Sequence, residues 1–88
     1  MVGFKKLRGV DLPEEKQGLI RYTCLTWEAQ PQHIQKKIRR LCEQCGGAES
    51  AALWEVMCTK RSITAIARAR FTSESVLYRL RKRFYESW

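Results

Sequence analysis

The side chains with the most informative types and spacing lie between residues 72 and 83. Hydroxyl, carboxylate, phenol, guanidinium and ammonium groups follow one another there, at Ser73, Glu74, Ser75, Tyr78, Arg79 and Lys82. An arginine can pair with guanine through two hydrogen bonds, and a carboxylate can accept one from cytosine. Leu77 and Leu80 recur at helical spacing between these residues, which places the polar groups on the outer face of one helix. The pattern predicts hydrogen bonding to the base edges of nucleic acid.

Six further residues are candidates for contacts with phosphates of the same ligand. Such contacts set affinity and position without reading sequence. The candidates are Lys60, Arg61, Arg68, Arg70, Thr72 and Arg83. Residues 60–88 carry eight basic and two acidic residues, so most of the chain's net charge of +8 is concentrated there. The positive charge therefore favours a polyanionic partner, with a solvated basic face as the alternative interpretation.

The cysteines provide the second pattern with chemical potential. Cys42 and Cys45 have the C-x-x-C spacing of half a zinc or redox site. A structural zinc needs four ligands, and no second C-x-x-C is present. Both residues also extend an apolar helical stripe, so we expect buried thiols. Zinc binding remains the alternative, with the ligand set Cys24, Cys42, Cys45 and Cys58.

Catalytic patterns are missing from the sequence. It contains no evident nucleophile–base pair and no paired carboxylates. Gly46-Gly47 is not followed by the Lys-Ser/Thr of a phosphate-binding loop. We therefore expect neither an enzyme nor a cofactor.

Five helices and no strand are expected to position these residues. Apolar residues at helical spacing predict helices over about 13–28, 31–46, 48–60, 63–69 and 73–86. Pro13 and Pro31 suit the first helical position, and Gly46-Gly47 suits a helix end. Ser62 is the expected N-cap of the fourth helix, and Thr72 or Ser73 that of the fifth. Lys60 and Arg61 are expected to complement the dipole at the end of the third helix.

The chain of 88 residues has room for a single domain. We expect a compact all-α domain of four to five helices, with 1–12 as an irregular arm, 13–60 as supporting helices and 62–87 as a C-terminal helix-turn-helix. No apolar run of 18 residues occurs, so no membrane span is expected. The N-terminus has no apolar region typical of a signal peptide, which predicts a cytoplasmic protein with reduced thiols.

The spacing of Ile66-Ala67, Ser73, Leu77 and Leu80 resembles the helix-turn-helix superfamily, especially the sigma-factor region 4 type. The longer run from Trp54 to Lys82 is similar to the C-terminal segments of small phage late-gene regulators and antitermination-type proteins. The resemblance covers about residues 50–85. It implies that the second helix of the motif reads the major groove.

The turn departs from that pattern at three positions. Arg70 stands where a buried aliphatic residue is usual, Phe71 where glycine is usual, and Thr72 where an apolar residue is usual. We expect Phe71 to supply the missing core contact, which would leave Arg70 for a phosphate.

Together these patterns predict sequence-specific binding of duplex DNA by a transcriptional regulator of prophage or mobile-element origin, with homodimerisation as one arrangement. One alternative is an RNA polymerase-associated antitermination factor. Another is the DNA-binding subunit of a transposase, and a third is an interaction module whose charge serves solubility.

Overall fold

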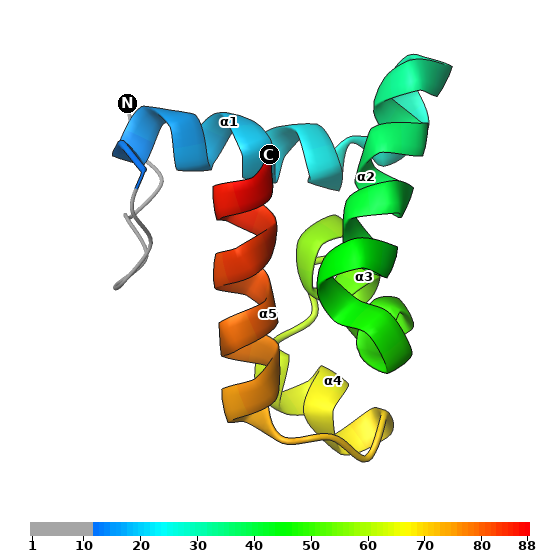
Figure 1. The fold of residues 1–88 in the computed structure, drawn as a ribbon, viewed down its shortest axis with the longest axis vertical. Helices are drawn as coiled ribbons and strands as arrows, with labels where there is room; N and C mark the ends of the chain where they lie inside the picture. Colours follow the sequence, from blue (N-terminus) through cyan, green and yellow to red (C-terminus); the bar gives the residue numbers. More distant parts are fainter. Residues whose placement is uncertain (1–11) are drawn as a thin grey trace.

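The computed structural model describes residues 12–88, and all regular elements in that range are helical (Figure 1). Five α-helices follow one another: α1 (Glu14–Leu25), α2 (Gln32–Gly46), α3 (Ser50–Cys58), α4 (Ile63–Ala69) and α5 (Glu74–Ser87). Short 3₁₀ turns at Trp27–Ala29 and Gly47–Glu49 lie before and after α2. The predicted all-α class is confirmed. Residues 1–11 of the predicted arm lie outside the described residues.

The helix ends follow the local signals of the sequence. Pro13 and Pro31 each stand immediately before a helix, one position earlier than predicted. Gly47 follows α2 with a φ of 54°, a conformation that glycine adopts without steric cost. Ser62 and Ser73 cap α4 and α5 by accepting hydrogen bonds from backbone N–H groups three residues on, at 3.1 and 3.2 Å.

Helix α3 lies at the centre of the fold, because it packs against each of the other four α-helices. Its residues Ala52, Leu53, Val56 and Met57 are buried in the main core cluster. A helix that is apolar on most sides must be surrounded by other elements. Helices α2 and α5 pack against each other and run lengthwise side by side in Figure 1, whereas α1 runs crosswise to them. The core thus forms around α3, and α4 lies at the end where α5 begins.

The connection between α4 and α5 is a turn of four residues, 70–73. The Thr72 N–H donates to the Ala67 carbonyl at 3.0 Å, a bond that closes a Schellman turn after α4. To form it, Phe71 takes a φ of 55°. Its side chain is 97% exposed, so the predicted core contact of Phe71 is wrong. The turn needs a left-handed residue at this position, and that backbone requirement leaves the ring in solvent.

The cysteines serve packing, as the apolar stripe predicted. Cys24, Cys42 and Cys45 are buried, Cys58 is half-buried, and all four are free thiols. Burial raises the pKa of Cys42 to about 12. Over residues 12–88 no three His, Cys, Asp or Glu side chains are arranged to hold a metal ion. In the same range no helix is long and apolar enough to cross a bilayer.

Candidate nucleic-acid interface

Helix α5 separates its apolar and polar side chains onto opposite faces. Leu77, Leu80, Phe84 and Tyr85 are buried against the rest of the domain. The six residues predicted to contact bases are all exposed: Ser73, Glu74, Ser75, Tyr78, Arg79 and Lys82. Ser75, Arg79 and Lys82 recur at positions i, i+4 and i+7, so they form one stripe along the outer face. The structure therefore brings the base-contact candidates together on one helix face.

Three of these candidates already make side-chain hydrogen bonds within the hairpin that α4, residues 70–73 and α5 form. The hydroxyl of Ser73 caps α5 and lies 3.2 Å from the hydroxyl of Ser75. Glu74 accepts a hydrogen bond of 3.0 Å from the hydroxyl of Thr64 in α4. The bond between Thr64 and Glu74 ties the N-terminal end of α5 to α4. Arg79 and Lys82, by contrast, make no hydrogen bond or ion pair with any residue of the described part.

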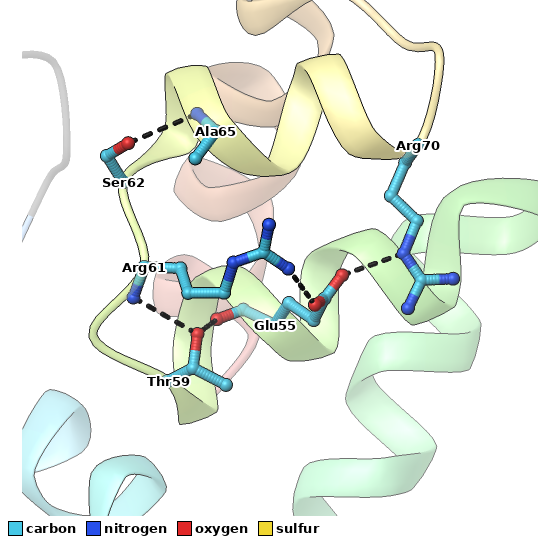
Figure 2. Close-up of polar contacts among 6 residues, drawn as sticks. All are labelled: Glu55, Thr59, Arg61, Ser62, Ala65 and Arg70. Atoms are coloured by element: carbon cyan, nitrogen blue, oxygen red, sulfur yellow. Dashed lines mark hydrogen bonds and ion pairs between the residues drawn. The ribbon is translucent and has the colours of Figure 1, made fainter.

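One carboxylate holds both ends of α4. Glu55 accepts from Arg61 Nη1 through Oε1 and from Arg70 Nε through Oε2, each at 2.7 Å (Figure 2). Arg61 precedes α4 and Arg70 follows it, so Glu55 ties the start and the end of this helix to α3. Both arginines were predicted to contact phosphates, and the structure gives each of them an internal partner instead.

The environment of Glu55 favours its charged form. Its side chain is 14% exposed, and burial by itself would raise the pKa of the carboxyl. The hydrogen bonds and charges of Arg70 and Arg61 outweigh burial, so the pKa lies below its ordinary value. Thr59 extends the network: its hydroxyl donates to the Glu55 carbonyl at 2.6 Å and accepts from the Arg61 N–H at 3.3 Å. The loop before α4 is thereby fixed to the end of α3.

The C-terminal end of α3 is capped by the side chain of a residue from a distant segment. Arg21 of α1 donates to the carbonyls of Val56, Met57 and Thr59, the last two at 2.8 and 3.0 Å. These carbonyls have no partner within a helix that ends at Cys58, so a cation there is favourable. Lys60 and Arg61 were predicted for this role, but both lie in the loop beyond the helix.

The other phosphate candidates are distributed around the hairpin. Lys60, Arg68 and Arg83 are exposed and form no ion pair within residues 12–88. Thr72 is half-buried, and its backbone closes the turn. The three exposed cations stand before α4, in its last turn and on α5. The exposed cations thus come from three different segments of the chain.

Two residues that organise this site were missed at the sequence level. Glu55 is the only charged residue in the largely apolar helix α3, and that isolation was a visible signal. Arg21 carried no such signal, because its role depends on where α1 crosses α3. No protein-family model, no curated protein and no solved structure matches this chain. The fold and the site define an all-α protein with a basic helix hairpin, whose first helix is held to α3 by the ion pairs of Glu55.

Proposed function

We propose that the chain binds duplex DNA through a helix-turn-helix formed by α4, residues 70–73 and α5, and thereby regulates transcription. One observation carries the proposal. Helix α5 buries one face completely and exposes, on the other, a stripe whose cations have no partner among residues 12–88. A side chain such as Arg79 gains most from a ligand when no internal carboxylate competes for it.

The dimensions and the supports of α5 suit this role. A helix with its side chains is about 10–12 Å across, and the major groove of B-DNA is about 12 Å wide. With α5 in that groove, Arg79 would read guanine, and Ser75 would lie one turn closer to the N-terminus. Lys60, Arg68 and Arg83 would contact phosphates. The ion pairs of Glu55 with Arg61 and Arg70 would hold α4 on α3, and the hydrogen bond between Thr64 and Glu74 would hold α5 on α4, while the hairpin docks.

A homodimer would supply the second half-site that a single helix-turn-helix needs for high affinity. Leu19 and Tyr22, both 65% exposed on α1, are apolar side chains that a second copy of the chain could cover. The resemblance to phage regulators supports an origin in a prophage or another mobile element.

Fluorescence anisotropy with random duplex DNA tests the proposal. If Lys60, Arg68, Lys82 and Arg83 make four phosphate contacts, raising salt from about 50 to 200 mM should weaken binding by about 10²-fold. Lys82→Ala should reduce the salt slope by about one. The matched control is Lys36→Ala, an exposed lysine on α2. Absence of binding at low salt, or equal effects of the two variants, would reject α5 as the interface.

A second candidate function is favoured by Phe71, whose fully exposed ring at the turn resembles an anchor for a protein partner. For an antitermination factor that partner would be RNA polymerase. Phe71→Gly would then abolish co-purification with polymerase and leave affinity for duplex DNA unchanged. Unchanged co-purification would argue against this candidate.

A further inference from the structure

A pocket of about 180 Å³ lies beside α5, where this helix meets α1, α3 and the loop before α4. Its polar lining consists of Arg21, Arg61, Ser62, Arg81 and Tyr85. Val56 and Ile63 form the apolar part of the lining. Among residues 12–88, no carboxylate lines it. Three arginine side chains from three segments of the chain therefore line one small volume.

The three arginines differ in how their charges are compensated. Arg61 is paired with Glu55. Arg21 donates only to neutral backbone carbonyls, and Arg81 stacks over the ring of Tyr78 at 5.0 Å from its centroid. Within residues 12–88 neither Arg21 nor Arg81 has a carboxylate partner. Within residues 12–88, no carboxylate therefore neutralises the charges of Arg21 and Arg81 beside the pocket.

The position of Arg81 is unfavourable for the protein alone. Arg81 is partly buried, and burial, together with the like charge of Arg21, lowers the pKa of its guanidinium. Burying an unpaired charge is unfavourable unless an opposite charge compensates it. An anion in the pocket would interact with both guanidinium groups at once.

We propose that this pocket binds the phosphate group of a small phosphorylated ligand. A phosphate monoester carries a charge between about −1.5 and −2 at neutral pH, which matches the two uncompensated arginines. A phosphodiester of the DNA backbone carries only one negative charge. Arginine also has the planar fork of N–H donors that suits phosphate oxygens.

The hydroxyl groups and the size of the pocket agree with this ligand. Ser62 Oγ accepts from the Ala65 N–H and retains its own proton to donate, and Tyr85 adds a second hydroxyl. The volume of about 180 Å³ is large enough for a phosphate or a diphosphate group. The pocket includes none of the stripe residues Ser75, Arg79 and Lys82, although its Arg81 lies over the ring of Tyr78.

Calorimetric titration of the full chain with inorganic phosphate, pyrophosphate and dimethyl phosphate, at constant ionic strength, tests the proposal. Pyrophosphate and phosphate should bind, and dimethyl phosphate, a monoanion, should bind at least about tenfold more weakly. Arg81→Gln should weaken pyrophosphate binding by about tenfold or more, the effect of one charge-assisted hydrogen bond. Arg83→Gln makes the same charge change on an exposed part of α5 outside the pocket and should leave binding unchanged.

Further variants keep the outcome decisive. Tyr85→Phe removes only the hydroxyl of a buried ring and should weaken pyrophosphate binding by a few-fold, with thermal unfolding checking that each variant is folded. Equal losses in Arg81→Gln and Arg83→Gln would reduce the effect to net charge and overturn the proposal. So would a loss of duplex DNA binding in Arg81→Gln without any effect on pyrophosphate, because the pocket would then hold a backbone phosphate.

Discussion

Replacing Phe71 by glycine should stabilise the protein, although it removes a large aromatic side chain. The ring is 97% exposed, so its loss removes almost no packing. The backbone φ of 55° costs a residue with a Cβ atom about 1–2 kcal/mol, a cost that glycine does not have. Glycine also lowers stability by about 0.5–1 kcal/mol, because it has more conformational freedom to lose when the chain folds. The expected gain in the free energy of unfolding is therefore about 0.5–1 kcal/mol.

Thermal and urea unfolding, followed by circular dichroism, measure this gain. For a domain of this size it corresponds to a rise in Tm of about 2–8 °C. Phe71→Ala is the matched control, because it removes the ring and keeps the Cβ atom, and it should change stability by less than about 0.5 kcal/mol. If both variants were destabilised to a similar extent, the ring would be contributing packing and the reasoning from its exposure would be refuted.

Three further predictions follow from the site and the core. Glu55→Gln should lower the free energy of unfolding by about 1–2 kcal/mol, allowing for the half-exposed arginines, whereas the exposed Glu43→Gln on α2 should have little effect. The pKa of Glu55 in the folded chain lies below its ordinary value of 4.5, so the stability that its ion pairs contribute is present above pH 4.5 and is lost as the pH falls through the folded-state pKa. Urea unfolding between pH 7 and 3 should therefore show the free energies of unfolding of the wild type and Glu55→Gln becoming equal in acid. A difference that stays constant with pH would contradict the pairing. Arg79→Ala should weaken specific DNA binding by about 1–3 kcal/mol and relax sequence choice, and an equal loss on specific and random DNA would exclude base reading. Since burial raises the pKa of Cys42 to about 12, its thiol should react with iodoacetamide far more slowly at pH 8 in the folded chain than in urea, as mass spectrometry of the labelled peptides would show.

The helices and their ends were predictable from the sequence, because the signals are local. Apolar residues at helical spacing identified the buried faces, including Leu77, Leu80 and Phe84 of α5. Ser62 and Ser73 act within three residues of their own positions, so their capping roles could be inferred without the fold. The burial of Cys42 and Cys45 followed from their place on an apolar stripe.

Only the tertiary structure decided which charges remain available to a ligand. Glu55 pairs with Arg61 and Arg70 because α4 folds back across α3, and composition alone counted both arginines as surface cations. Arg21 caps α3 across 35 residues or more of sequence. Phe71 was assigned to the core by its apolar character, yet the left-handed turn required at its position places the ring in solvent. Such roles depend on contacts between segments that are far apart in the sequence, and a local sequence pattern does not predict those contacts.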